Sequence, residues 1–236
     1  MKPDLNADLG EHEPPERTAA LMRHVTSANI ACGGHAGTPE TMRRAVGLAR
    51  AHGVRIGAHP GLAADFGRGG ALPDEAAFSD LLRRQTSALR EVAGGALHHV
   101  KLHGSLYHAT EQQPRLREAF VRFVAEMDAS VVVYALSGGA TVAAARAAGL
   151  TAWDEVFADR AYLPTGALVP RGEPGAVLHA ADAVAERVRR FARGEPIAAA
   201  DGTPLRLPAR TICLHGDSPQ SEELAAAARA ALEALS

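Results

Sequence analysis

Residues 27–59 read SANIACGGHAGTPETMRRAVGLARAHGVRIGAH, and this stretch decides the fold. Its first five residues, 27–31, form a short β-like run. Thr38 and Pro39 are the residue types that cap and begin a helix, and Gly53 is a typical helix end. Residues 54–58 then form a second β-like run. A strand, a helix and a second strand in this order are typical of a parallel sheet with right-handed crossovers.

The same alternation continues along all 236 residues. The β-like runs are residues 2–5, 27–31, 54–58, 98–102, 130–136, 152–157 and 210–214. The expected helices are residues 38–53, 73–94, 114–127, 139–148, 175–193 and a last one that begins at 218. Seven units predict the α/β class and one single (β/α) barrel domain over residues 1–236, seven-stranded, with an open doubly wound sheet as the alternative. Residues 194–208, with Asp201 and Gly202 at their middle, predict a small hairpin arm before the last strand.

Charge and cysteine content exclude several classes of protein. The chain has 25 Lys and Arg against 27 Asp and Glu, a net charge of -2, so no basic excess exists for nucleic acid or an anionic membrane. Cys32 and Cys213 are far apart, which excludes a disulfide framework and favours a reducing cytosol. No apolar leader is visible, and the longest apolar run, residues 131–136, is too short for a bilayer. We therefore expect a cytoplasmic protein.

Polar side chains follow one β-like run after another. In a barrel, the carboxyl ends of the strands form the mouth where active sites are built. We expect residues two apart to share a face, so that Lys101 lies between His99 and His103 on the inside of the barrel. The residues that these positions bring to the mouth are Asp4, Asn6, Asp8, Asn29, His35, His59, Lys101, His103, Asp159, Arg160, His215 and Asp217. The remaining histidines that we interpret as hydrogen-bonded packing residues are His12, His24, His52, His98, His108 and His179.

Two further features bear on the chemistry. Lys2 and Lys101 are the only lysines among the 25 basic residues, so Lys101, in an apolar stretch, indicates a place that needs a compact ammonium group. Residues 32–37 are glycine-rich and precede a helix, where backbone N–H groups can bind an anion. The chain nevertheless lacks the Gly-Lys-Ser/Thr ending of a P-loop. We expect no ATP site of that type.

Several motifs together resemble one known family. They are residues 4–11 (DLNADLGE), 27–33 (SANIACG), 35–37 (HAG), 57–60 (GAHP), 66–68 (FGR), 100–104 (VKLHG), 157–162 (FADRAY) and 215–217 (HGD). In this order they resemble the LamB/YcsF family. The resemblance implies a (β/α) barrel related to the glycoside hydrolase/deacetylase group. It also implies hydrolysis of 5-oxo-L-proline to L-glutamate coupled to ATP cleavage, by a 5-oxoprolinase in which this chain is the A subunit and acts with 5-oxoprolinase subunits B and C.

The resemblance implies roles for particular residues. The implied catalytic residues are Asp8, His59, Lys101, His103 and Asp217. The implied substrate-binding residues are Asn6, Asn29, His35, Arg68, Asp159, Arg160, Tyr162 and His215. ATP would be handled with the partner subunits, and a divalent metal is left open. The positions that depart from the family pattern surround these residues and concern substrate detail; they are Gly34, Thr38, residues 61–66, Gly69, Leu102, His108 and Thr165.

Two other function classes remain open from the residues alone. A stand-alone metal-dependent deacetylase or amidohydrolase would use Asp4, Asp8, His59 and His103 as ligands around an open coordination position. A non-catalytic binding protein that carries a sugar or a lactam is the third interpretation.

Overall fold

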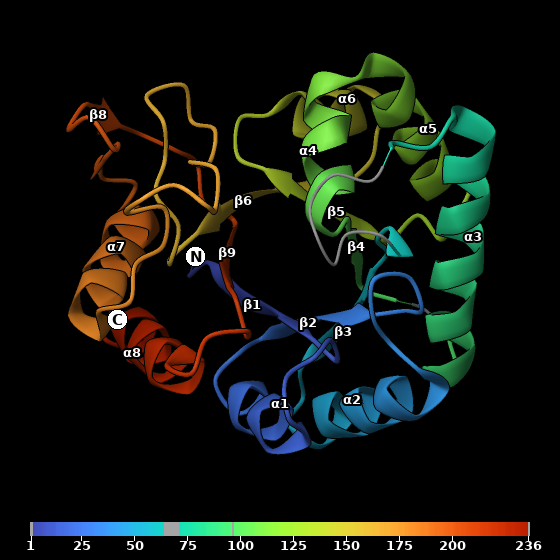
Figure 1. Ribbon diagram of the computed structural model, residues 1–236, viewed down its shortest axis with the longest axis horizontal. Helices are drawn as coiled ribbons and strands as arrows, with labels where there is room; N and C mark the ends of the chain where they lie inside the picture. Colours follow the sequence, from blue (N-terminus) through green and yellow to red (C-terminus); the bar gives the residue numbers. More distant parts are fainter. Residues whose placement is uncertain (1, 64–70, 96, 236) are drawn as a thin grey trace.

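The computed structural model describes residues 2–63, 71–95 and 97–235. Within these residues, seven parallel strands close into a barrel in the order β1-β2-β3-β4-β5-β6-β9 (Figure 1). The strands are β1 (Asp4–Leu9), β2 (Ser27–Ala31), β3 (Arg55–His59), β4 (His99–Lys101), β5 (Val132–Leu136), β6 (Ala152–Phe157) and β9 (Thr211–Leu214). Strand β9 pairs with both β1 and β6 and so closes the ring. The predicted seven-stranded barrel is confirmed, and the alternative of an open sheet is wrong.

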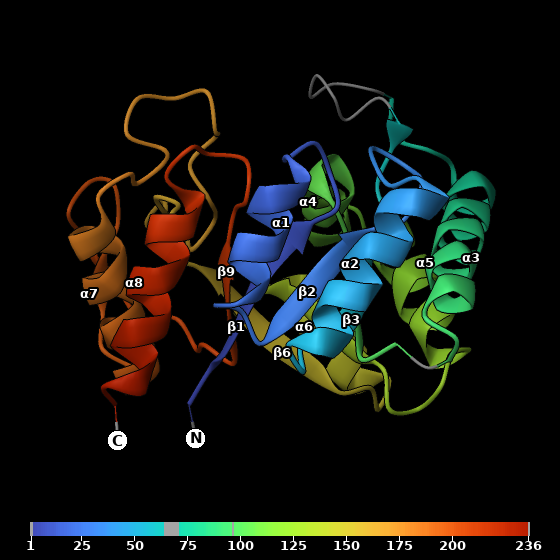
Figure 2. The same cartoon turned by 90° about the horizontal axis from the view of Figure 1, so that it is seen from below.

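Helices surround the barrel on its outside (Figure 1). They are α1 (Pro15–Met22), α2 (Pro39–Ala51), α3 (Glu75–Val92), α4 (Gly104–Gln112), α5 (Pro114–Ala125), α6 (Ala140–Ala147), α7 (Ala181–Arg193) and α8 (Ser221–Glu233). Figure 2 shows both termini at one end of the barrel and the long connection from β6 to α7 at the other. Among the described residues, no helix is long and apolar enough to cross a membrane.

Local sequence signals account for several helix ends. The Thr38 side chain accepts a hydrogen bond from the Thr41 N–H group, and Pro39 occupies the first turn of α2, as predicted. Asp74 caps α3 in the same way through the Ala77 N–H group. Gly194 ends α7 with a φ of 64°, a left-handed conformation that favours glycine.

Other boundaries differ from the sequence prediction. Helix α7 begins at Ala181 rather than at residue 175, because residues before it form bridges with the segment after β6. Helix α8 begins at Ser221, three residues after its predicted start at residue 218. Helices α1 and α4 were not predicted. The segment 194–208 contains the short strands β7 (Ile197–Ala198) and β8 (Pro204–Leu205), which pair antiparallel.

The predicted range of strand β1 needs the most informative correction. Residues 2–5 were expected to form it, but it extends from Asp4 to Leu9, so Asn6 and Asp8 lie within the strand and not after it. Leu5, Ala7 and Leu9 belong to the hydrophobic core. The three polar residues of the strand alternate with them and therefore face the barrel interior.

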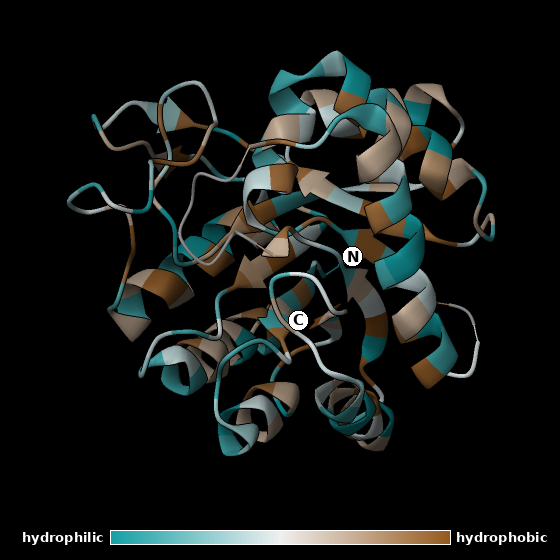
Figure 3. Cartoon of the chain, turned by 45° about the vertical axis from the view of Figure 1, so that its right-hand side comes forward, coloured by the Kyte–Doolittle hydropathy of each residue, from teal (hydrophilic) through white to brown (hydrophobic). Residues whose placement is uncertain are grey.

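Polar residues occupy much of the inside of this barrel. The apolar core lies between the strands and the helices, where Leu5, Ile30, Val100 and Ile212 are fully buried. Figure 3 shows hydrophobic residues along the strands and both hydrophilic and hydrophobic residues on the helices around them. The buried polar and charged residues on the inner face of the strands are Asp4, Asn6, Asp8, Ser27, Asn29, His59, His99, Lys101, Glu155 and Thr211. Most barrels fill this space with branched apolar side chains, so these polar groups need partners.

Candidate functional site

The amino end of the barrel holds a hydrogen-bond network around Asp4, which Thr211 links to Asn6 in the middle of the barrel. Its carboxylate accepts hydrogen bonds from Ser27, Tyr134 and Thr211, and it pairs with Arg55. Asp4 and Asp8 are four residues apart in one strand, which corresponds to about 13 Å. Asp4 therefore does not reach the mouth, and its predicted place there beside Asp8 as a metal ligand is wrong.

A chain of hydrogen bonds crosses the middle of the barrel. The Asn29 amide donates to Asn6 Oδ1 at 2.7 Å and to Asp8 Oδ1 at 2.8 Å. His99 Nε2 donates to Asn29 Oδ1 at 2.7 Å, and the Asn6 amide donates to Glu155 Oε1 at 3.0 Å. Asn6 and Asn29 are fully buried, so they orient other residues of the site.

Lys101 lies inside the barrel, below the rim. Its ammonium group is 2.8 Å from Asp8 Oδ1, 3.2 Å from Glu155 Oε1 and 3.0 Å from Cys213 Sγ, and its side chain is 2% exposed. Burial alone would lower the pKa of Lys101, but the charges of Asp8, Cys213 and Glu155 raise it well above its usual range. Lys101 thus holds Asp8 Oδ1 from inside the barrel, and its catalytic role stays a prediction.

The two carboxylates beside Lys101 have opposite pKa shifts. Burial alone would raise the pKa of Asp8, but the charges of His59 and Lys101 hold it well below its usual range. Burial raises the pKa of Glu155 in spite of the Lys101 charge. Asp8, at the carboxyl end of β1, is therefore a carboxylate at neutral pH with a fixed orientation.

Glu11 and three histidines converge at the rim above Asp8. Glu11 Oε1 is 2.8 Å from His35 Nε2, 3.2 Å from His103 Nδ1 and 3.6 Å from His59 Nε2. His59 Nε2 and His103 Nδ1 are 3.1 Å apart, and the rings of His35 and His103 stack with centroids 3.5 Å apart. In the part of the chain that the structure describes, this is the one group of such side chains arranged as a metal ion would need.

Burial and hydrogen bonding set the charges of this cluster. Burial lowers the pKa of His35 to about 4, so the ring is neutral at pH 7. Burial alone would raise the pKa of Glu11, but hydrogen bonds from His103 and His35 lower it. Burial alone would lower the pKa of His59, but the charge of Asp8 raises it. The rim thus combines a carboxylate and imidazole nitrogens, which are typical metal ligands and acid–base groups.

A second polar pair follows β6 and β9, and β9 is the neighbour of β1 in the barrel. His215, just after β9, contacts Asp159 with 2.9 Å between Nδ1 and Oδ2 and stacks on Phe157. Burial alone would raise the pKa of Asp159, but the charge and hydrogen bonds of His215 lower it. Both residues follow strand ends, as the sequence predicts.

Other predicted site residues lie apart from these groups. Asp217 is 53% exposed and pairs with Arg171, so its catalytic role stays a prediction. Arg160 is buried and donates to the Val169 and Ala176 carbonyl groups. The Tyr162 hydroxyl accepts a hydrogen bond from the Phe157 N–H group. These contacts fix the segment after β6. Arg68 lies outside the described residues.

Two residues of the site were missed by the sequence prediction. Glu11 stands in the first motif, two residues past β1, and its position after a strand end was the available signal. Glu155 is two residues from both Trp153 and Phe157 along β6, so it shares their face inside the barrel. The adjacent Asp154 is also acidic and obscures that pattern. Glu155 is fully buried beside Lys101.

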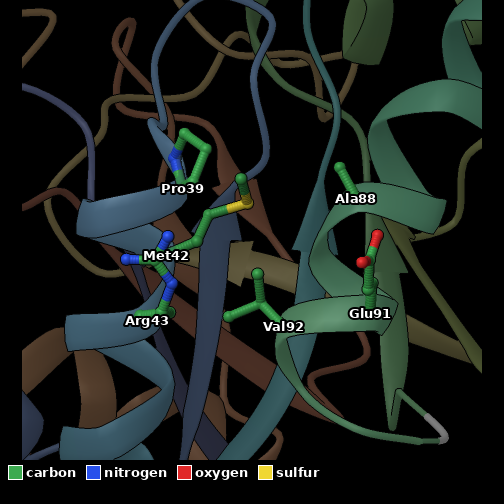
Figure 4. A pocket seen from close by; sticks show the side chains of 6 residues that line it. All are labelled: Pro39, Met42, Arg43, Ala88, Glu91 and Val92. Carbon is green, nitrogen blue, oxygen red and sulfur yellow. The ribbon is translucent and has the colours of Figure 1, made fainter.

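A surface groove between α2 and α3 is distinct from this site. Figure 4 shows Pro39, Met42 and Arg43 of α2 on one side and Ala88, Glu91 and Val92 of α3 on the other. The volume of this groove is about 500 Å³. The groove lies between helices on the outside of the barrel and includes none of the rim residues. It is therefore not the candidate site.

Comparison with known proteins identifies a family and a fold. The model of the LamB/YcsF family matches residues 3–236. A Bordetella pertussis protein, named as the A subunit of 5-oxoprolinase, is 44% identical, over 98% of this chain and 94% of its own length. The crystal structure of a lactam utilization protein from Thermus thermophilus is 36% identical, with a TM-score of 0.89 over 99% of this chain and 97% of that one.

A more distant structure shares the architecture alone. A family 4 carbohydrate esterase from Streptomyces lividans is 13% identical, with a TM-score of 0.51 over 99% of this chain and 88% of that one. Since the family model spans almost the whole sequence, and relatives match at this level from end to end, this chain belongs to the LamB/YcsF family.

Proposed function

We propose that this chain is the A subunit of an ATP-dependent 5-oxoprolinase, in which the lactam ring of 5-oxo-L-proline opens to give L-glutamate. The names of the relatives from Bordetella pertussis and Thermus thermophilus support a lactam as substrate. The observation that carries the proposal is the ionised Asp8, held from inside by Lys101 and facing His59 at the mouth of the barrel.

Ring opening requires few chemical steps from the protein. Water adds to the lactam carbonyl carbon, the C–N bond breaks, and the ring nitrogen takes a proton to become the amino group of glutamate. An unstrained lactam is a poor electrophile. Transfer of the ATP γ-phosphoryl group to the carbonyl oxygen, with release of ADP, makes the carbonyl carbon a better electrophile. Water then adds to that carbon, the C–N bond breaks to leave a γ-glutamyl phosphate, and a second water molecule releases phosphate. Because the chain has no P-loop, we assign the ATP step to a complex with subunits B and C.

The described residues suggest how the proton moves. Asp8 is the proposed proton acceptor for water, because Lys101 and Asn29 fix Oδ1 while Oδ2 lies 3.3 Å from His59 Nε2. The His215–Asp159 pair, which follows the neighbouring strand β9 and strand β6, is the proposed donor to the leaving nitrogen. Amide hydrolysis needs both a general base and a general acid near the scissile bond.

An assay of the complete complex tests the proposal. Asp8→Asn removes the proton acceptor and keeps the size of the side chain, so glutamate release should fall by roughly 10²–10⁴-fold. His52→Ala alters an exposed histidine at the end of α2 and is the matched control. Glutamate release at an unchanged rate in the Asp8→Asn complex would show that Asp8 is not the base.

A second candidate function follows from the rim cluster. A carboxylate and three imidazoles around one point also suit an ATP-independent amidohydrolase. The two candidates differ in one measurement, because only the first requires ATP and the partner subunits for glutamate release. Acetate release from N-acetylated sugars by the chain alone would favour the second.

A further inference from the structure

The rim cluster has an unusual balance of hydrogen-bond donors and acceptors. His59 Nδ1 is 2.9 Å from the Lys101 carbonyl oxygen, which can only accept, so the proton of a neutral His59 ring must be on Nδ1. His59 Nε2 then presents a bare lone pair to Asp8 Oδ2 at 3.3 Å and Glu11 Oε1 at 3.6 Å. His103 Nδ1, 3.1 Å from His59 Nε2, can supply a proton to these acceptors, and a metal ion bound among them would take the place of that proton.

The spacing of the ligand atoms matches a transition metal. Zn²⁺ lies about 2.0–2.2 Å from nitrogen and carboxylate ligands, so two ligands of a tetrahedral site are about 3.3 Å apart. The separations of the rim atoms are 2.8, 3.2 and 3.6 Å from Glu11 Oε1 to the three histidines and 3.1 Å between His59 and His103. All four ligand atoms lie within 4.8 Å of one another.

His59 is also oriented as a metal ligand is. The Lys101 carbonyl group holds the far nitrogen of His59, which is the common way that proteins fix a ligating imidazole. Among the described residues, Nδ1 of His35 is buried without a hydrogen-bond partner, so the polar contact of that ring is made through Nε2 toward the cluster. The His35 and His103 rings are stacked in parallel, so binding of one ion by both requires one ring to turn. His35 and His59 are buried, whereas Glu11 and His103 are 18% and 22% exposed, so the cluster opens toward solvent on one side.

We propose that Glu11 Oε1, His35 Nε2, His59 Nε2 and His103 Nδ1 bind one divalent transition-metal ion of the Zn²⁺ class. A bound ion of this class polarises a carbonyl group and lowers the pKa of water. Asp8, which is not in the ligand set, stays beside the ion as the proton acceptor. The site stands on the geometry of the cluster and does not depend on which amide the protein hydrolyses.

Metal binding by the whole chain tests the inference directly. The protein is produced without a histidine tag, stripped with a chelator, and dialysed against Zn²⁺ or Co²⁺. Elemental analysis gives the stoichiometry, and the visible spectrum of the Co²⁺ form reports the number and type of ligands. We expect one ion per chain and an intense Co²⁺ spectrum with nitrogen and oxygen ligands.

Two variants and a control locate the ion. Loss of a ligand costs more than loss of the group that orients it, so His35→Ala and Glu11→Gln should each weaken binding by roughly 100-fold or more. Glu11→Gln is nearly isosteric and guards against a folding defect in His35→Ala. His52→Ala, an exposed histidine outside the cluster, should bind the ion as the parent does.

The outcomes separate this inference from the proposed function. A stripped chain that takes up no Zn²⁺ or Co²⁺, or variants that bind as tightly as the parent, would overturn the metal site even if the complex releases glutamate. Stoichiometric binding that the two variants lose would establish the site even if 5-oxoproline is not a substrate.

Discussion

Replacement of Lys101 by Met removes the cation that neutralises two buried carboxylates. Its ammonium group contacts Asp8 at 2.8 Å and Glu155 at 3.2 Å, and Glu155 is fully buried. Methionine has a similar length and an apolar tip. The variant therefore keeps the volume of the side chain and loses only its charge and its hydrogen bonds.

The expected loss of stability is large because a charge is left unpaired. Removal of one partner of a buried ion pair typically costs about 3–5 kcal/mol. For a chain of this length, each kcal/mol lowers the melting temperature by about 2–4 °C, so the expected shift is roughly 6–20 °C. Lys2→Met is the matched control, since Lys2 is exposed and should change stability by less than about 0.5 kcal/mol.

Urea unfolding followed by circular dichroism measures these free energies. A Lys101→Met/Glu155→Gln double variant should recover part of the loss, because the second change removes one unpaired carboxylate.

The pH dependence of the stability loss in Lys101→Met has a defined sign. Burial raises the folded-state pKa of Glu155, so its ionisation costs stability as pH rises through that pKa. The difference between Lys101→Met and the parent should therefore be smaller at about pH 5 than at about pH 8. A loss below about 1 kcal/mol, or no recovery in the double variant, would refute the reasoning.

The other predictions concern the inside of the barrel. Lys101→Arg should also lower both stability and turnover, because a longer, planar guanidinium does not fit between Asp8, Glu155 and Cys213; unchanged kcat, KM and Tm would contradict this. His59→Ala should lower turnover by roughly 10²-fold or more with an unchanged circular dichroism spectrum, and parent-like kinetics would exclude it from the site. Gly57→Ala should cost about 1–3 kcal/mol, because an added Cβ would lie 2.1 Å from His99 Nε2, whereas Gly47→Ala in α2 meets nothing within 4 Å and should not destabilise. Asp4→Asn should cost about 1–3 kcal/mol at the amino end of the barrel while kcat per folded molecule stays near the parent value.

The architecture was predictable because local signals repeat along the chain. Thr38, Pro39 and Asp74 mark helix starts by chemistry that acts over three or four residues. The β-like runs between helices then imply parallel strands, and short connections favour a ring of neighbours. The order of the strands in the barrel agrees with their order in the chain, apart from the small β7–β8 pair.

The interior of the barrel was harder to predict. Polar residues usually end a strand, so Asn6 and Asp8 shortened the predicted first strand. Their partners are in fact buried residues of other strands, namely Asn29 of β2, Lys101 of β4 and Glu155 of β6. The pairing of Lys101 with Glu155 joins β4 to β6 across the interior, and no local pattern contains that contact. Asp4 shares its face with Asp8, but only the strand boundaries show that the two lie at opposite ends.

The rim cluster of Glu11, His35, His59 and His103 shows the same limit. His35, His59 and His103 were each predicted at the mouth, because each follows a strand. Their convergence on Glu11 depends on the loop after β1 and the loop after β2, whose conformations the sequence does not specify. Alternation within strands thus predicted which residues reach the mouth, and loop geometry decides which of them meet.

Release of glutamate and phosphate from 5-oxo-L-proline tests the central claim most directly. It would be measured at matched concentrations for this chain alone, for subunits B and C alone, and for the three together, with and without ATP. We predict both products in equal amounts only from the complete mixture with ATP. The unactivated lactam presents too high a barrier, because each ~1.36 kcal/mol of activation free energy lowers the rate tenfold. Glutamate release by this chain alone without ATP, at the rate of the complete mixture, would contradict it.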